Sequence, residues 1–124
     1  MRTTLSSLVA MALVWGLPAF AQTSAGVKGV VTDSSGALVP GAEITVTNLD
    51  TGARRHTLAT ETGAYEVPLL QPGRYSVASH KPGFKQAVRS GVELELNQIA
   101  QIDFILVTGE LTETIEVQAS APLL

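Results

Sequence analysis

The fold is decided by the stretch Val31-Thr32-Asp33-Ser34-Ser35-Gly36-Ala37-Leu38-Val39-Pro40-Gly41-Ala42-Glu43-Ile44-Thr45-Val46. A short strand is predicted to end at Asp33, where Ser34-Ser35-Gly36 turns the chain. Pro40-Gly41 turns it again, before a second strand that alternates apolar and polar residues. Aspartate, serine, proline and glycine favour turns because they preset or permit the backbone angles, or bond the backbone themselves. The stretch therefore indicates a small β-sandwich, and it points to no particular chemistry.

Short alternating segments continue along the rest of the chain. Such alternation marks strands with one buried face, and Gly or Pro stands between most of them. Gly29 is unusual inside a strand and indicates a bulge or the close approach of a neighbouring side chain. We expect an all-β, seven- to eight-stranded Greek-key β-sandwich of the prealbumin or immunoglobulin type. The expected strands are 27–33, 43–49, 54–60, 65–67, 75–79, 92–96, 99–107 and 113–118, with 85–89 as a weak strand or a loop.

Three of these strands carry further expectations. The strand 54–60 is a mostly polar returning strand. Pro68 limits pairing, so the strand 65–67 is short or lies at an edge. In 99–107 one face is apolar and is expected to point inward, with Ala100, Ile102, Phe104 and Leu106.

The first 21 residues have the pattern of a secretory signal peptide. Arg2 gives a short positive start, residues 5–20 are mostly apolar, and Ala19-Phe20-Ala21 fits the small-x-small cleavage rule. The apolar run is shorter than the roughly 20 residues that span a membrane, which disfavours a transmembrane anchor. We therefore expect a signal-peptide helix that is cleaved after Ala21, followed by export.

Composition limits what the exported chain can be. Its 124 residues contain no cysteine, so the fold relies on a hydrophobic core and not on disulfides. The net charge is -3 and the pI is about 5.2. Nucleic-acid binding calls for a basic stripe, which this chain lacks. We expect one domain, over residues 22–107, that is monomeric and binds no nucleic acid.

Three sequence blocks share their order and spacing with a known family. They are Gly29-x-Val31-Thr32-Asp33-x-x-Gly36-Ala37-x-Val39-Pro40-Gly41-Ala42, then Thr60-x-x-Gly63-x-Tyr65, and then Leu70-x-Pro72-Gly73-x-Tyr75-x-Val77 with Gly83-Phe84. In these blocks the chain resembles the carboxypeptidase-regulatory-like domain, a transthyretin-like or prealbumin-like seven-stranded sandwich. The resemblance extends over roughly residues 26 to 107.

The ends of the chain resemble a subtype, the N-terminal extension of Oar-like TonB-dependent outer-membrane receptors. In those receptors a signal peptide precedes the sandwich. A Glu-rich strand like Thr112-Glu113-Thr114-Ile115-Glu116-Val117 and an Ala-Pro-Leu-Leu segment then lead into the plug and barrel. We therefore expect residues 108–124 to be a last strand and a linker to a plug domain that should follow. The resemblance implies a location in the periplasm or at the outer membrane.

The resemblance implies a non-catalytic module without cofactor or metal. In metallocarboxypeptidases this sandwich accompanies the catalytic domain and carries no zinc ligands. We therefore expect an accessory or interaction domain of a receptor, or a fragment of one, whose partner is a protein or the following plug and barrel. The sandwich also resembles starch-binding-like modules, so carbohydrate binding is the alternative. An open edge strand would favour the first function, and an exposed aromatic patch the second.

Metal ligands are sparse in the sequence. A zinc site needs two or three converging ligands, but His56 and His80 are the only histidines and stand in no ligand-spaced motif. Asp33 and Asp50 could offer oxygens to calcium, which needs six or more. We favour the interpretation that both aspartates cap turns through side-chain to backbone hydrogen bonds.

Other pairs of polar residues suggest little chemistry. No Gly-x-Ser-x-Gly elbow exposes a serine nucleophile. Glu93 and Glu95 share one strand face and are expected to be solvated, without the unequal environments that a glycosidase requires. Lys28 and Asn97 are the one loosely suitable pair for an intramolecular crosslink, but alternation places Lys28 toward solvent.

The aromatic residues bear on carbohydrate binding, which commonly uses an aromatic platform. Tyr65, Tyr75 and Phe104 fall on the inward faces of their strands, so core packing is expected for them. Phe84 follows Pro82-Gly83 and is expected to fold onto the edge of the core, where it is the aromatic with the best chance of exposure. It is therefore the candidate ligand contact.

Overall fold

The computed structural model describes residues 16, 24–109 and 114–118, and all of its regular elements are strands. Their bounds agree with most of the sequence-based expectations. They are β1 (Ala25–Asp33), β2 (Glu43–Asn48), β3 (Arg54–Leu58), β4 (Ala64–Leu70), β5 (Gly73–His80), β6 (Gln86–Leu94), β7 (Ile99–Gln101), β8 (Phe104–Leu106) and β9 (Thr114–Gln118).

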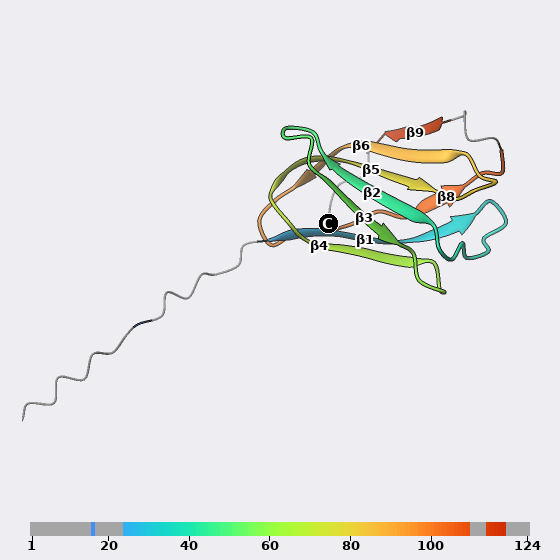
Figure 1. The fold of residues 1–124 in the computed structure, drawn as a ribbon, viewed down its shortest axis with the longest axis horizontal. Coiled ribbons are helices and arrows are strands. Elements are labelled where there is room, and N and C mark those ends of the chain that lie inside the picture. The colour runs from blue at the N-terminus through green and yellow to red at the C-terminus, as the bar shows by residue number, and fades with distance from the viewer. Residues whose placement is uncertain (1–15, 17–23, 110–113, 119–124) are drawn as a thin grey trace, which may run out of the picture.

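The strands form two sheets that face each other (Figure 1). One sheet has the order β4-β1-β7, with β8 also pairing with β1, and the other has the order β3-β2-β5-β6-β9. The pairings of β1 with β7 and β8, and of β6 with β9, are parallel, and the others are antiparallel. The predicted all-β sandwich is therefore confirmed.

The leader lies outside the described residues, and so do the predicted signal-peptide helix and the cleavage after Ala21. Within the described part of the chain, no helix is long and apolar enough to cross a membrane.

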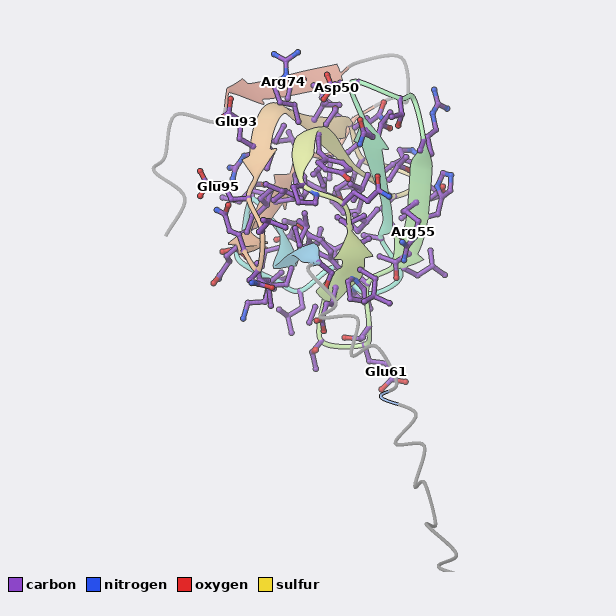
Figure 2. All side chains as sticks on the ribbon, turned by 90° about the vertical axis from the view of Figure 1, so that its left-hand side faces the viewer. Asp50, Arg55, Glu61, Arg74, Glu93 and Glu95 are labelled. Atoms are coloured by element: carbon purple, nitrogen blue, oxygen red, sulfur yellow. The ribbon has the colours of Figure 1, made fainter. Side chains whose placement is uncertain are left out.

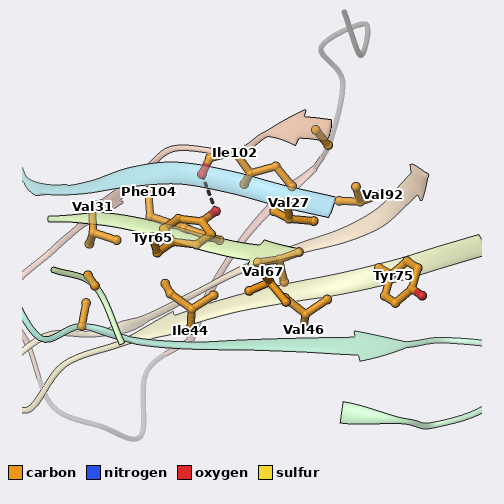
Figure 3. Close-up of a cluster of buried hydrophobic side chains, with 14 of the residues drawn as sticks. Val27, Val31, Ile44, Val46, Tyr65, Val67, Tyr75, Val92, Ile102 and Phe104 are labelled. Carbon is orange, nitrogen blue, oxygen red and sulfur yellow. Dashed lines mark hydrogen bonds between the residues drawn. The ribbon is translucent and has the colours of Figure 1, made fainter. Parts of the chain in front are cut away.

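The core lies between the two sheets, where strands of both turn their apolar alternate residues inward (Figure 3). On β1, Val27, Gly29 and Val31 are buried, while Lys28 is exposed, as alternation predicts. Valine and isoleucine supply seven of the eight large apolar side chains that are fully buried, and these residues suit a pleated, half-buried surface. The eight are Val27, Val31, Ile44, Val46, Val77, Val92, Ile102 and Leu106.

The segment predicted as two pieces, 85–89 and 92–96, is one strand, β6. A bulge joins the two pieces, because the register with β5 shifts between the pairs Tyr75–Val92 and Val77–Arg89. Gly91 lies at this bulge with φ 71°, a conformation that glycine adopts without steric cost.

The segment predicted as one strand, 99–107, is interrupted between β7 and β8. Its inward face is as expected, since Ala100, Ile102, Phe104 and Leu106 are all buried. The ladder to β1 breaks at Asp103, where the side-chain Oδ1 accepts the Val30 N–H at 2.9 Å in place of a backbone carbonyl. A single side chain therefore replaces one ladder bond and divides the strand.

The strand predicted at 65–67 extends further than expected. Pro68 was expected to end it early, but β4 continues to Leu70 because Pro68 lies in a bulge. The register with β1 shifts there, and Leu69 has φ 58°. A proline is tolerated at a bulge or an edge because no ladder hydrogen bond needs its missing N–H. The predicted edge position of this strand is confirmed.

Candidate functional site

Gly29 and Tyr65 meet at the carbonyl of Ile102, in the centre of the first sheet. A β-carbon at Gly29 would lie 1.8 Å from the Ile102 carbonyl oxygen, so only glycine fits. The Tyr65 hydroxyl donates a hydrogen bond to the same oxygen (Figure 3). Burial, reinforced by the Asp103 carboxylate, raises the pKa of Tyr65 above its ordinary value. A close approach occurs at Gly29, but the nearest group is a backbone carbonyl and not the side chain that was predicted; the Tyr65 ring comes next, 3.0 Å from the position of the β-carbon.

A second contact joins the first two sequence blocks. Gly63 has φ 74°, and a β-carbon there would lie 2.7 Å from the Val31 carbonyl oxygen. That carbonyl also accepts the N–H of Val39, and the Gly63 carbonyl accepts the N–H of Val31. The residues that define the sequence blocks therefore hold strands and loops together, and the candidate site must be sought elsewhere on the surface.

Asp33 caps its turn as predicted. Its Oδ1 accepts hydrogen bonds from the Ser35 hydroxyl at 2.6 Å and from the amides of Ser35 and Ala37 at 2.9 and 3.0 Å. The Ser35 hydroxyl is the main cause that lowers the pKa of Asp33 below its ordinary value. These contacts account for the carboxylate as a structural group.

Asp50 does not cap the next turn, contrary to the prediction. Asn48, which is buried at the end of β2, accepts the amides of Asp50 and Thr51 through Oδ1, at 2.8 and 3.1 Å. The Asp50 carboxylate instead lies 3.8 Å from a guanidinium nitrogen of Arg74 at the surface (Figure 2). The cap is set by the residue that precedes the turn, because its side chain reaches the following amides.

The two histidines lie on different strands, β3 and β5. His56 Nδ1 is 3.1 Å from the Thr45 hydroxyl and 3.6 Å from a Glu43 carboxylate oxygen. His80 Nε2 is buried without a hydrogen-bond partner. No group of three or more histidine, cysteine, aspartate or glutamate residues that could hold a metal occurs within the described residues.

The remaining polar pairs are exposed and lie apart from one another. Glu93 and Glu95 are both solvated and point outward on one flank of the sandwich, as expected (Figure 2). Lys28 lies on the outer face of β1, whereas Asn97 lies in the turn after β6 with φ 59°. Lys28 lines one surface hollow and Asn97 another.

The aromatic residues are mostly interior. Tyr65, Tyr75 and Phe104 are 3 to 4% exposed, so their predicted role in core packing is confirmed. Phe84 folds onto the edge of the core, as predicted: it is half-buried, packs against the core and forms an isolated bridge with Thr108. Its role as a ligand contact stays a prediction.

The strand β3 lies at one edge of the five-stranded sheet. Among the described strands it pairs only with β2, and Arg54, Arg55 and His56 are exposed, as is Leu58 at 64%. The sequence indicated a mostly polar returning strand here without marking it as a site. The polar run is a partial signal, because a strand without a buried residue is not enclosed by the core, but the order of the sheet decides which strand is outermost.

The hydrogen bonds of the ladder show which groups of β3 are open. Asn48 N bonds Ala53 O, and Ala59 N bonds Ala42 O, in the same register as the β2–β3 pairs. Bonded and non-bonded pairs alternate in an antiparallel ladder. The N–H and C=O groups of Arg54, His56 and Leu58 therefore point away from β2, along the outer edge.

Arg55 connects this edge to the other sheet. Its side chain shares the inward side of β3, because Arg55 stands opposite the buried Val46. From there it donates to the Pro68 and Leu69 carbonyls of β4, at 3.3 and 3.5 Å. The carbonyls of the β4 bulge are thus covered, while the outer edge of β3 is left open.

A shallow hollow of about 440 Å³ lies over the first sheet, away from β3. Its polar walls are the side chains of Lys28, Glu66 and Gln101, which are neighbours in register across β4, β1 and β7. Its floor includes Val30 and Tyr65. A mixed floor and rim of this kind suits a small polar ligand.

The fold and these surfaces define the class of the molecule as a small prealbumin-type β-sandwich with an open edge at β3. The chain belongs to the carboxypeptidase regulatory-like domain family, whose model matches residues 26–107. This agrees with the resemblance found in the sequence blocks.

Known relatives place the domain in larger proteins. The chain is 32% identical over 117 residues to the TonB-dependent transporter Oar of Myxococcus xanthus, and the match covers 93% of this chain and 11% of that protein. It is 34% identical over 82 residues to carboxypeptidase Z of Rattus norvegicus, with 65% of this chain and 12% of that protein covered. The chain thus spans about a tenth of the length of each of these relatives.

A solved structure with this fold is described as that of a putative carbohydrate binding protein from Bacteroides uniformis. It superposes with a TM-score of 0.55 at 21% identity, covering 68% of this chain and 41% of that one. This likeness concerns the fold alone.

Proposed function

We propose that the chain is a non-catalytic, exported interaction module of a TonB-dependent outer-membrane receptor, and that it binds a protein partner by adding a strand to β3. The observation that carries the binding mode is the open edge of β3, where three residues present unpaired N–H and C=O groups. An extended segment that pairs with such an edge gains main-chain hydrogen bonds without any preformed cavity.

The receptor context is supported by the similarity to Oar, which extends beyond the sandwich to 93% of the chain. The proposal that the module is non-catalytic is supported by the structural roles of the residues in the sequence blocks. Gly29, Gly63 and Tyr65 serve close packing and hydrogen bonding between strands, and the Asp33 carboxylate caps a turn. Gly29 and Tyr65 also line the hollow over β1, but Gly29 has no side chain and the Tyr65 hydroxyl is hydrogen-bonded to the Ile102 carbonyl, so neither offers a free reactive group.

The receptor context is tested by sequencing the coding region beyond Leu124. A reading frame that continues into a plug domain is the expected result. A stop codon directly after Leu124 would overturn the receptor context, while the proposed role of β3 would still be open to the experiments described below.

Carbohydrate binding is the second candidate, and the hollow over β1 favours it more than Phe84 does. Lys28, Glu66 and Gln101 can donate to and accept from hydroxyl groups, and Tyr65 forms part of the floor. Titration with a maltooligosaccharide, followed by backbone amide shifts, tests this function. Shifts confined to these strands, and abolished by Lys28→Ala together with Glu66→Ala, are the result that would support it.

A further inference from the structure

We infer that the segment which adds to β3 is acidic; this rests on the proposed function of β3 as a docking edge. The strand carries Arg54 and Arg55 and no carboxylate. Arg54 is exposed and makes no hydrogen bond or ion pair within the described residues. Opposite charges on paired strands attract, whereas like charges placed opposite one another repel.

The positive charge of this edge is local. The whole chain has a net charge of -3, and the exposed Glu93 and Glu95 lie on the flank opposite Arg55 (Figure 2). The Glu43 carboxylate lies 3.6 Å from His56 Nδ1, and within the described residues it makes no ion pair with either arginine of β3. An acidic partner would therefore be attracted to the β3 edge more than to the acidic flank of the sandwich.

The geometry of the edge favours a polypeptide over other anions. Arg54, His56 and Leu58 present alternating N–H and C=O groups, and an extended peptide backbone can satisfy both kinds. A phosphate chain offers acceptors only, so it would leave the outward carbonyls unpaired. A second copy of the chain that paired through its own β3 would bring four arginines together, which like-charge repulsion disfavours.

The open positions also predict the pattern of the partner. Arg54, His56 and Leu58 share the outer face, while Arg55 and Thr57 share the inward face. An acidic side chain is thus expected on the outer face of the incoming strand beside Arg54, because the Arg55 guanidinium is already bonded to the Pro68 and Leu69 carbonyls on the inward face. An apolar side chain is expected beside Leu58, which is 64% exposed.

The experiment titrates the ¹⁵N-labelled chain with three blocked nine-residue peptides, in which valine alternates with glutamate, threonine or lysine. The glutamate peptide is expected to bind most tightly and to shift the outward amides of Arg54, His56 and Leu58 more than those of Arg55 and Thr57. Raising the salt concentration should weaken this binding, because exposed charges are screened.

Two variants and a matched control locate the binding. His56→Pro removes one outward N–H and is expected to abolish binding of all peptides. Arg54→Glu is expected to lower the affinity for the glutamate peptide about fivefold, because an exposed charge that attracts the peptide is replaced by one that repels it. Arg74→Glu reverses an exposed charge on β5 beside Asp50, away from β3, and should leave the affinity within about twofold.

Each outcome decides between the proposals. Equal affinity for the glutamate and threonine peptides, still lost in His56→Pro, would overturn the acidic partner and leave the docking edge in place. Failure of every peptide to bind the folded chain, or binding that His56→Pro leaves unchanged, would overturn the docking edge itself. Concentration-dependent self-association that His56→Pro abolishes would replace the acidic partner with a second copy.

Discussion

β3 and β4 are edge strands of different sheets that lie close enough for Arg55 to bridge them, yet their edges are built in opposite ways. The β4 edge is interrupted by a bulge, lacks an N–H at Pro68, and has the carbonyls of that bulge covered by Arg55. The β3 edge has neither bulge nor proline, and its outward groups are unpaired within the described residues. Natural sheets protect their edges with bulges, prolines or charges. On β3 the charges of Arg54 and Arg55 are the protection, and because they would repel a basic strand and attract an acidic one, they are a reason to expect selective binding there.

The residues of the first two sequence blocks meet in the sheet that contains β4. Gly29, Tyr65 and Ile102 form a close-packed junction there. The arginines of β3, in contrast, are outside all three sequence blocks. The features that identify the family at this junction build the sandwich, and they are separate from the arginines that would select a partner.

The largest expected effect follows from breaking the closed junction. Gly29→Val would force a β-carbon to within 1.8 Å of the Ile102 carbonyl oxygen, so β1 and the β7–β8 segment must separate. We expect a loss of more than about 3 kcal/mol in the free energy of unfolding, or failure to fold. Urea denaturation followed by circular dichroism measures this, with Gly52→Ala, a glycine in an open turn, as the comparison. Near-native stability of Gly29→Val would contradict the account of the junction.

A pair of proline substitutions sharpens the comparison between the two edges. The backbone N–H of Thr57 points toward β2 and bonds Ile44, so Thr57→Pro should cost about 2 to 3 kcal/mol in the free energy of unfolding. The backbone N–H of His56 points away from β2, so His56→Pro should cost at most about 1 kcal/mol, much as β4 tolerates Pro68. Thermal unfolding of the two variants measures the difference. If both variants lost the same stability, the assignment of outward groups on β3 would be wrong.

Much of this architecture could be predicted from the sequence, because alternation and turn residues are local signals. The inward faces of β1, β5 and the 99–107 segment were correct, as was the cap at Asp33. The division of 99–107 could not be predicted, because it depends on Asp103 reaching Val30, 73 residues earlier in the chain. The same holds for Arg55, whose partners on β4 are set by the packing of one sheet on the other.

The candidate site was predicted less well than the fold. Phe84 was selected because it follows Pro82-Gly83, but long-range pairing with Thr108 partly covers it. Asp50 was chosen as a turn cap by residue type, whereas the chain geometry gives that role to Asn48. An open edge is a property of sheet order, and the sequence of β3 alone could not show that no further described strand lies beside it.

A smaller effect is expected at the hydroxyl of Tyr65, within the closed junction. Tyr65→Phe leaves the Ile102 carbonyl without this donor and should cost about 1 to 2 kcal/mol in the free energy of unfolding. The raised pKa of Tyr65 adds a pH dependence. The unfolded chain releases this proton above about pH 10 while the folded chain keeps it, so its stabilising contribution is lost as the pH rises.

The alkaline part of that prediction is measured by urea denaturation between pH 8 and pH 11, with the range chosen to span the ordinary tyrosine pKa of about 10. The stability of the unaltered chain should fall more steeply than that of Tyr65→Phe. Tyr75→Phe is the control, because it removes a hydroxyl bonded to the Gln71 carbonyl and leaves the junction intact. Parallel pH profiles for the unaltered chain and Tyr65→Phe would show that this hydroxyl does not titrate as described.

The smallest expected effect is at the exposed turn after β1, which neither edge involves. Ser35→Ala removes the hydroxyl that contributes most to lowering the pKa of Asp33, while the amides of Ser35 and Ala37 can still donate. The carboxyl pKa, followed by NMR, should therefore rise toward its ordinary value without reaching it. Because a lowered pKa stabilises the fold above the unfolded value and that contribution is lost in acid, the variant should differ from the unaltered chain at neutral pH and converge with it as Asp33 becomes protonated. A difference in stability that persists at low pH would mean that Ser35 acts through packing and not through the carboxylate.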